Sequence, residues 1–342
     1  MSDLRINNIT DRTGDSGPVI AGVSTVSTTG AFTVPVGPTE YRGGRGRAVF
    51  GSGSTPSGTN VLDTIEIATT GNATDFGDDS IIRTEGNASF SSSTKGFYAG
   101  GWVSPVVSST ISYLTFSSGG GVNDFGDLKN PMYSQGGCGN STRGLSGGGM
   151  DEPSTSIPYS NIVEYVTLTS TGDGTDFGDL TVGRRYLASG IASPTRGIWH
   201  GGGPAPSGVS NIIDYVTITT LGNAKDFGNL ITGRNAQTGT SNSTRGLIIS
   251  GQTPTNLNII EYVTIATEGN GTDFGDVSNA VDYAGACASS TRGVVAGGQT
   301  PTKINVIEYM TISTAGNATD FGDLTVARRF GQGCSDVHGG LG

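Results

Sequence analysis

The triplet Asp-Phe-Gly recurs six times in the 342-residue chain, and its aspartate is a residue that can hold a metal ion. In phosphoryl-transfer enzymes this aspartate binds Mg²⁺, but the same site needs a lysine in a Val-Ala-Ile-Lys context and a catalytic His-Arg-Asp. Neither sequence occurs here. A catalytic motif also has no reason to be present in six copies, so we interpret the triplet as structural. We expect its Phe to pack between neighbouring units and its Asp and Gly to shape the turn into a strand.

Two further groups of carboxylates could form sites. The loop before the triplet, for example 172–179, brings acids and amides together, but it lacks the 12-residue cadence ending in Glu that a Ca²⁺ loop needs. We interpret it as a turn and predict no metal. A second set of acids shares one strand position, with Ser112 in the remaining unit, and we expect each acid to pair within its blade with the basic residue of the preceding turn. The acids are Glu66, Glu164, Asp214, Glu261 and Glu308, the basic residues are Lys95, Arg143, Arg196, Arg245 and Arg292, and similar pairing is expected for Arg184-Arg185 and Arg328-Arg329.

The imidazole and thiol side chains do not form a catalytic set. His200 and His338 have no Cys or second His at metal-ligand spacing, and no Ser-His-Asp order emerges. Cys138, Cys287 and Cys334 each lie five residues before the same turn position, so they fall on equivalent strands and are expected to be small buried thiols. We therefore predict no catalytic residue and no cofactor, and expect that the protein is not an enzyme.

The triplets mark an internal repeat that must position all of these residues. A nearly constant period of this length is typical of repeat architectures. The triplet aspartates are 49, 52, 50, 47 and 47 residues apart, at Asp75, Asp124, Asp176, Asp226, Asp273 and Asp320. Each unit divides into four short strands, and in unit four we expect them at 186–193, 198–202, 211–220 and from Asp226 towards Arg234. The first strands are rich in Gly, Ala, Ser and Cys, which favours strands that converge on a narrow axis.

The two ends of the repeat complete each other. Residues 330–340 match a first strand with no second strand behind it, whereas residues 47–53 match a second strand with no first strand before it. Placing both in one blade closes the ring and removes exposed sheet edges. The sequence therefore predicts an all-β, six-bladed propeller with four-stranded blades over residues 43–342, preceded by an extended N-terminal arm at 1–42.

The repeat unit resembles that of the kelch family of β-propellers, in which a double glycine ends the second strand and a spaced tyrosine follows. The chain departs from the family by using Asp-Phe-Gly where the family usually has Trp, and by Ser250-Gly251 in unit five, so it resembles a divergent kelch-like set. The double glycines are Gly100-Gly101, Gly148-Gly149, Gly202-Gly203 and Gly297-Gly298, and the tyrosines are Tyr113, Tyr165, Tyr215, Tyr262 and Tyr309.

The arm at residues 1–42 stands outside the repeat. Two apolar runs around Thr28-Thr29-Gly30 predict a hairpin, which needs a partner surface because a lone hairpin is marginal in water. Together with the Asp-Phe-Gly-Asp-Leu repeats, the arm resembles structural proteins of tailed bacteriophages, particularly those of marine cyanobacteria. The resemblance implies a virion component, assembled in the host cytoplasm, whose arm docks onto other virion proteins. The expected docking residues are Val19, Ile20, Val23, Val26, Phe32 and Val34.

Charge and hydropathy restrict the partners. The chain has 29 acidic and 19 basic residues and a net charge of −10, which disfavours nucleic acid, since affinity for phosphate backbones comes from clustered Lys and Arg. The N-terminus has no apolar run typical of a signal peptide, and no stretch approaches the roughly 20 apolar residues of a membrane span. We therefore expect no nucleic-acid partner, no membrane insertion and no signal peptide.

Loops after the second and fourth strands vary among the units, whereas the turns after the first and third strands are nearly identical. Variable loops on a rigid scaffold are where binding usually occurs. The candidate residues on this variable face are Trp102, Met150, Asp151, Glu152 and Tyr159. The first hypothesis is a non-enzymatic virion structural protein, displayed on the particle by its arm and contributing to host attachment. The alternative is a carbohydrate-recognition module whose ligand, a host surface glycan, lies on the variable face; an enzyme acting on polysaccharide lacks a suitable pair of acids.

Overall fold

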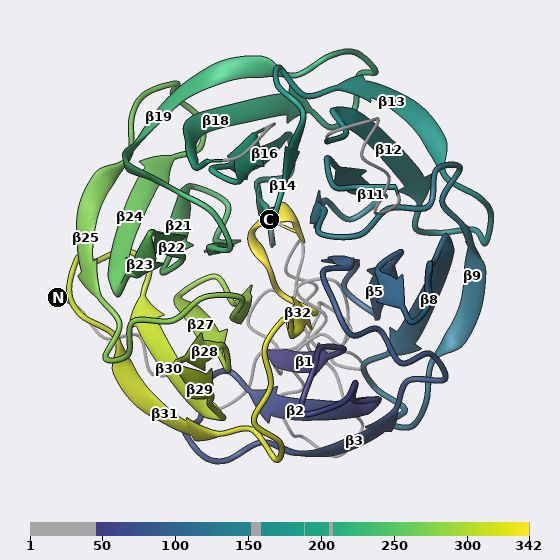
Figure 1. Cartoon of the computed structure of the whole chain (residues 1–342). Coiled ribbons are helices and arrows are strands. Elements are labelled where there is room, and N and C mark those ends of the chain that lie inside the picture. Colours follow the sequence, from purple (N-terminus) through teal and green to yellow (C-terminus); the bar gives the residue numbers. More distant parts are fainter. Residues whose placement is uncertain (1–45, 152–158, 188, 205–207, 342) are drawn as a thin grey trace, which may run out of the picture. The chain divides into compact units, whose positions relative to one another are not determined.

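The computed structural model describes residues 46–151, 159–187, 189–204 and 208–341 of the chain. Within these residues, six four-stranded antiparallel sheets surround a central axis, and the first strand of each sheet lies nearest the axis (Figure 1). The prediction of an all-β, six-bladed propeller with four-stranded blades is confirmed. The arm at 1–42, with its predicted docking residues, and the loop residue Glu152 lie outside the described residues.

Blades 1 to 3 contain the first half of the described chain, together with one strand from its end. Blade 1 consists of β32 (Gln332–Ser335), β1 (Arg47–Gly51), β2 (Val61–Glu66) and β3 (Thr74–Asp78). Blade 2 consists of β4 (Ala88–Ser91), β5 (Lys95–Ala99), β8 (Thr110–Thr115) and β9 (Asn123–Asp127). Blade 3 consists of β10 (Gly136–Gly139), β11 (Arg143–Gly147), β12 (Ile162–Thr167) and β13 (Thr175–Asp179).

Blades 4 to 6 repeat the arrangement. Blade 4 consists of β15 (Ile191–Ala192), β16 (Arg196–His200), β18 (Ser210–Thr217) and β19 (Lys225–Arg234). Blade 5 consists of β20 (Thr238–Ser241), β21 (Arg245–Ile249), β24 (Ile259–Thr264) and β25 (Thr272–Asp276). Blade 6 consists of β26 (Gly285–Ala288), β27 (Arg292–Ala296), β30 (Val306–Thr311) and β31 (Thr319–Asp323). The first strand of blade 4 is shorter than the predicted 186–193, because Tyr186 has a left-handed φ of 56° that a strand does not accept.

Blade 1 joins the two ends of the propeller, as predicted. Strand β32 pairs antiparallel with β1, with Cys334 opposite Val49 and Ser335 opposite Ala48. The inner strand of this blade therefore comes from the end of the chain and its three outer strands from the beginning (Figure 1). The ring is closed by the backbone hydrogen bonds between β32 and β1, so β1 has a strand partner on both sides, like the second strand of every other blade.

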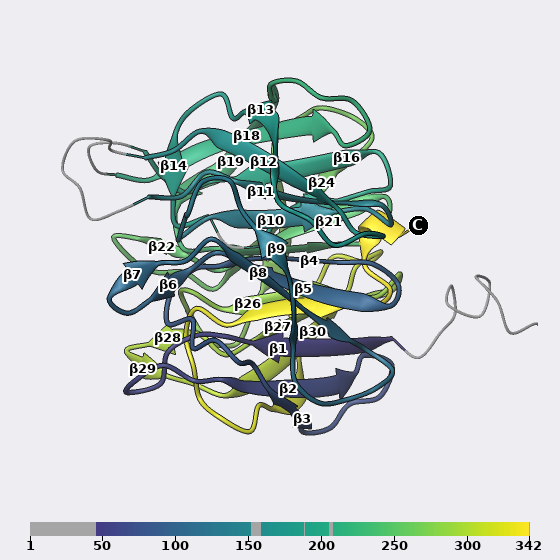
Figure 2. The same ribbon diagram turned by 90° about the vertical axis from the view of Figure 1, so that its right-hand side faces the viewer.

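The propeller has two faces of different character. We call the side with the turns after first and third strands the turn face, and the side with the connections after second and fourth strands the loop face. The short 3-10 helix η1 (Gly339–Leu341) follows β32 on the turn face, opposite the ladders of the loop face (Figure 2). The loop-face ladders are β6 (Trp102–Val103) with β7 (Val106–Val107), β14 (Arg184–Arg185) with β17 (Gly203–Pro204), β22 (Gln252–Thr253) with β23 (Thr255–Asn256), and β28 (Gln299–Thr300) with β29 (Thr302–Lys303).

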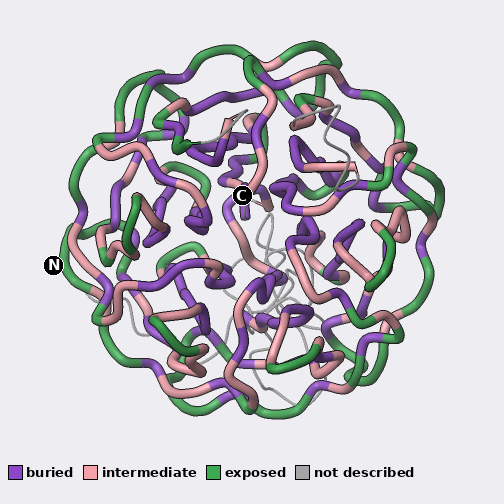
Figure 3. Tube along the Cα trace, in the orientation of Figure 1, coloured by how far each residue is buried: buried purple, intermediate pink, exposed green. Residues whose placement is uncertain are grey.

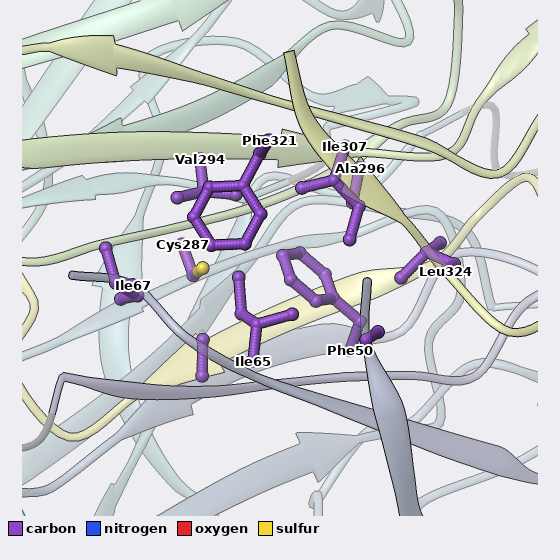
Figure 4. Close-up of a cluster of buried hydrophobic side chains, with 11 residues drawn as sticks. Phe50, Ile65, Ile67, Cys287, Val294, Ala296, Ile307, Phe321 and Leu324 are labelled. Carbon is purple, nitrogen blue, oxygen red and sulfur yellow. The ribbon is translucent and has the colours of Figure 1, made fainter. Parts of the chain in front are cut away.

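The apolar core lies between the blades. Inner strands are buried along their whole length, whereas outer strands bury mainly the Phe of Asp-Phe-Gly (Figure 3). Phe321 on β31 of blade 6, for example, packs with Ile65 and Ile67 of blade 1 (Figure 4). The equivalent Phe residues of the other blades each occupy a cluster of this kind, so the prediction that the Phe packs between neighbouring units is confirmed.

The Asp-Phe-Gly triplet lies within the outer strand and not in the turn before it. Its glycine sits at a β-bulge with positive φ, as at Gly275, where φ is 147°. A Cβ there would lie 2.5 Å from the carbonyl oxygen of Gly316 in the next blade. The N–H of Gly316 in turn donates to the carbonyl of Phe274 over 2.7 Å. The triplet therefore joins blades through its backbone as well as through its Phe side chain.

The predicted pairing of strand acids with turn cations is wrong for the buried acids, although the partly exposed Glu66 does pair within its blade, with Arg47 Nε 3.4 Å from Glu66 Oε1. In blade 3, Glu164 lies opposite Ser146, which is three residues along the strand from Arg143. This offset separates Glu164 from Arg143 by about 10 Å. Arg143 instead stacks 4.7 Å above the Tyr165 ring and donates to the Ile218 carbonyl of the next blade over 2.8 Å. In blade 1, Glu66 lies opposite Arg47, and Asp63 takes the position that Glu164 has in blade 3.

Three of the buried acids pair with arginines from the connections between blades, whereas Glu164 and Glu308 accept hydrogen bonds from backbone N–H groups. Arg184 pairs with Asp214 and Arg234 with Glu261, and Arg328 Nη2 lies 2.6 Å from Asp63 Oδ2. The side chains of these pairs are at most 2% exposed. The expectation of pairing with acids is therefore correct for Arg184 and Arg328, whereas Arg185 and Arg329 stack on the rings of Tyr186 and Phe330.

Candidate functional site

The C-terminal tail closes the central channel on the turn face. The Nε2 atom of His338 lies 2.7 Å from the carbonyl oxygen of Ser91, and a Cβ on Gly339 would lie 2.4 Å from the carbonyl oxygen of Asn242. The tail thus contacts the ends of inner strands from several blades. A cavity of about 50 Å³ lined by the inner strands remains along the axis. A ligand would approach the axis from the loop face.

One residue of each blade connection adopts a left-handed backbone around the axis on the loop face. Neighbouring members are joined by backbone hydrogen bonds, since Phe330 N–H donates to the Tyr283 carbonyl over 2.8 Å and Tyr283 N–H to the Ala236 carbonyl over 2.9 Å. A left-handed φ is unfavourable for bulky side chains, yet three of the six residues are aromatic. These residues, the inner ring, are Gly86, Ser134, Tyr186, Ala236, Tyr283 and Phe330, with φ between 42° and 58°.

The residue before each inner-ring residue forms a second circle, the outer ring. Each forms a short antiparallel bridge to a loop-face segment, for example Glu85 to Trp102 and Tyr133 to Met150. The backbone therefore holds six equivalent positions, while their side chains are two carboxylates, two guanidinium groups, a phenol and an amide. A scaffold that repeats while its side chains vary leaves those side chains free for recognition. The outer ring consists of Glu85, Tyr133, Arg185, Asn235, Asp282 and Arg329.

Three of the predicted loop-face residues meet through the outer ring. The Trp102 and Tyr133 rings lie 5.5 Å apart. Arg185 stacks 4.7 Å above the Tyr159 ring, and its Nη1 lies 3.2 Å from the sulfur of Met150. The structure thus brings Trp102, Met150 and Tyr159 to one side of the channel mouth. Asp151 follows Met150 on the same loop and is half-buried.

The inner-ring aromatics form the other part of the site. The Tyr186 and Tyr283 rings are 5.7 Å apart and edge-on, and Tyr283 lies 4.0 Å from the Phe330 ring. Arg185 stacks 4.4 Å above Tyr186, and Arg329 stacks 5.0 Å above Phe330. A small pocket between these aromatics has a volume of about 10 Å³, which is room for about one water molecule. The mouth is therefore a shallow aromatic platform with two arginines at its rim.

The acids of the outer ring are partly or fully buried and lie near Arg329. Burial raises the pKa of Asp282 to about 6, against the lowering effect of Arg329. Burial also raises the pKa of Glu85, and Arg329 again acts in the opposite direction. Buried atoms without a hydrogen-bond partner among the described residues include Asp282 Oδ1, Asn235 Oδ1 and Arg329 Nε. Since buried polar groups are normally paired, these atoms can bind a further group.

Other reactive side chains give no second site in the part of the chain that the structure describes. His200 is buried, its Nδ1 lies 3.3 Å from the Gln237 amide nitrogen, and burial lowers its pKa to about 3. The three cysteines are free and buried, as predicted, and burial raises the pKa of Cys138 to about 12. The described residues hold no group of three or more His, Cys, Asp or Glu side chains placed to bind a metal ion. Among them, too, no helix has the length and apolar character needed to cross a bilayer.

Sequence reasoning missed both rings. It selected loops by length and aromatic content, and those loops frame the rings. A signal was present: the eighth residue after the triplet aspartate is arginine in four units, at Arg83, Arg184, Arg234 and Arg328, and the residues just after it vary in chemistry. Along the sequence, residues that are the same in most units give way at this point to residues that differ between units. This is where each connection between blades reaches the channel mouth.

Comparison with known protein families and with curated protein sequences finds no match for the chain. The fold and the site geometry are therefore the basis for a function.

Proposed function

We propose that the chain is a non-enzymatic structural protein of a tailed-phage virion, in which a kelch-like propeller is anchored by residues 1–42. The proposal is supported by the chain entering the propeller on one face while the variable loops lie on the other. The described chain enters the propeller at Gly46, whose carbonyl accepts a hydrogen bond from Ile67 at the turn-face end of blade 1. Both rings and the variable loops belong to the opposite face (Figure 2). The covalent link to residues 1–42 is thus at the turn face, and in this proposal the loop face meets a host surface.

The resemblance of the arm to structural proteins of tailed bacteriophages supplies the virion context. The arm would dock onto other virion proteins through its apolar residues Val19, Ile20, Val23, Val26, Phe32 and Val34. Deleting 1–42 should leave a folded, monomeric propeller that no longer enters particles. The measurement is the copy number of the protein in purified particles, with Phe32→Asp as a point variant and Thr28→Ser as its control. Wild-type incorporation of the deleted form would contradict the proposal.

A second function, recognition of a host surface glycan, is favoured by the channel mouth. The partly exposed Trp102 and Tyr133 rings lie beside the stacked Arg185 and Tyr159 side chains. Aromatic rings with an apolar face and a polar edge suit ligands that have both characters. This function is compatible with the first, since a virion protein that displays the loop face can also bind the host there.

A further inference from the structure

We propose that the loop-face mouth of the channel, formed by Arg185, Tyr186, Asp282, Tyr283 and Arg329, binds a neutral pyranose residue of a glycan. This inference deepens the second function above and rests on it. It is independent of how the propeller is anchored. The backbone conformation, the charge balance, the unpaired polar atoms and the shape of the mouth all favour such a ligand.

Two tyrosines occupy positions whose left-handed backbone conformation is unfavourable for aromatic side chains. Tyr186 and Tyr283 have φ values of 56° and 52°, while the equivalent residue of blade 2 is Gly86. Glycine or asparagine would meet this conformation at lower cost. Both tyrosines are only half-buried, so core packing does not explain them fully. Their rings lie where a ligand on the axis would touch them, at the rim of the small pocket.

The charges of the outer ring cancel. Glu85 and Asp282 contribute two carboxylates, and Arg185 and Arg329 contribute two guanidinium groups. Arg329 lies close enough to both acids to lower their pKa values. A site for an acidic polymer would need an excess of cations, as nucleic-acid sites do. The balanced set favours an uncharged ligand.

The unpaired atoms match hydroxyl groups. Oδ1 of Asp282 and Oδ1 of Asn235 are acceptors, and Nε of Arg329 is a donor, all without a partner among the described residues. Asp282 is 7% exposed, so its free oxygen is a buried group that gains from a hydrogen bond. These atoms are buried and do not line the small pocket, so a sugar lying on the tyrosines reaches them only once the Arg329 and Asn235 side chains turn outward. A hydroxyl group can then donate to the two oxygens and accept from the nitrogen. A sugar ring offers several hydroxyls and an apolar C–H face for the tyrosines.

The shape of the mouth sets how the sugar is held. The pocket between Tyr186, Tyr283 and Phe330 has a volume of only about 10 Å³, so a ring cannot enter it. The sugar would lie across the tyrosines as on a platform. A single shallowly bound ring is expected to have a Kd of about 1 mM. Useful affinity would require several sugar residues or several copies of the protein.

The test measures glycan binding to the full chain. Cellohexaose, mannohexaose and laminarihexaose serve as neutral probes and polygalacturonate as an anionic one, followed by calorimetry and by Trp fluorescence. Trp102 reports on the mouth because its ring lies 5.5 Å from that of Tyr133, whereas the other tryptophan, Trp199, is 1% exposed between blades. We expect at least one neutral probe to bind and to change the Trp fluorescence.

Two variants locate the binding. Arg329→Gln removes the unpaired donor, and Tyr283→Asn removes an aromatic ring while keeping a residue that accepts left-handed φ. Each should weaken binding at least about tenfold. The matched control is Arg245→Gln, which removes an arginine that stacks on Tyr262 at the turn face and should change affinity less than about twofold. Circular dichroism and thermal unfolding confirm that each variant is folded.

Three results would overturn the proposal: no neutral probe binds the wild type, binding is unchanged in both folded variants, or polygalacturonate binds in preference. The anchoring proposal is tested separately, because deletion of 1–42 should abolish particle incorporation and leave glycan affinity unchanged. Failure of one experiment therefore does not imply failure of the other.

Discussion

Single residues explain how charged groups are accommodated between the blades. Arg184 and Asp214 are fully buried, and the guanidinium also donates to the carbonyls of Gly201 and Ile212. In blade 3, Met132 stands at the position that Arg184 has in blade 4, and Glu164 stands at the position of Asp214. Glu164 accepts hydrogen bonds from the backbone N–H groups of Lys129 and Asn130, both over 3.0 Å. Blade 2 has a third arrangement, in which Arg83 pairs with Asp79 of the same connection and the strand position holds Ser112. Each arrangement leaves the carboxylate with partners.

The first prediction concerns this buried ion pair. Arg184→Met should destabilise the protein by about 3 to 5 kcal/mol, because Asp214 keeps its burial and loses its cation. The double variant Arg184→Met with Asp214→Ser, which copies Ser112 of blade 2, should recover most of that loss. Urea unfolding measures both, with the half-exposed Arg143→Met as control. An equal cost for the single and double variants would show that the unpaired charge is not the cause.

A second prediction follows from the raised pKa of Asp282. Its ordinary value is 3.8 and its folded value is about 6, so its contribution to stability is present below 3.8 and is lost as pH rises towards 6. At pH 7 the ionised, buried group costs at most about 3 kcal/mol. Asp282→Asn should therefore gain stability relative to wild type between pH 4 and pH 7. The measurement is urea unfolding at both pH values, with Asp151→Asn as control; a gain that does not vary with pH would argue against burial of the charge.

At the scale of strands, the outer strand of each blade depends on its bulge glycine. The third prediction is that Gly275→Ala destabilises the protein by at least about 2 kcal/mol, since its Cβ would meet the Gly316 carbonyl at 2.5 Å with φ of 147°. The matched control is Gly269→Ala, where no atom lies within 4 Å of the added Cβ and the cost should be below about 0.5 kcal/mol. Thermal and urea unfolding compare the two. Similar costs would mean that loss of backbone freedom, and not contact with the next blade, determines the effect.

The strands and their connections show which parts of the fold the sequence predicts. The constant spacing of Asp-Phe-Gly and the small residues of the inner strands were enough to predict six blades and their closure. The register within β2 was mistaken although the spacing contains it. Asp63 precedes the triplet aspartate Asp75 by the same number of residues as Glu164 precedes Asp176, and Glu66 was taken for Asp63. The rings were also missed, since the left-handed φ of Tyr186 or Tyr283 arises from the convergence of six connections and leaves no local turn signal.

At the scale of the whole molecule, closure of the ring and separation of the faces have the same origin. Strand β32 completes blade 1, and the tail after it packs across the channel on the turn face. Within the described residues, a ligand would therefore approach the axis from the loop face. The varied side chains of the outer ring lie on that face. A binding site at the loop-face mouth depends on this closure, because its six connections come from all six blades.

The last prediction tests that dependence. Deleting residues 331–342 removes β32 and with it the hydrogen bonds from Ser91 Oγ to the Ser335 carbonyl over 2.7 Å and from Ser335 Oγ to the Ala288 carbonyl over 2.6 Å. Strand β1 would then present an open inner edge, which favours pairing with other chains. We expect the truncated protein to aggregate or to unfold at a temperature lower by at least about 10 °C. The control, deletion of 341–342, keeps β32 and His338 and should remain a monomer. Light scattering and thermal unfolding distinguish the outcomes, and a monomeric truncated propeller with unchanged midpoint would mean that five complete blades hold the ring without the closing strand.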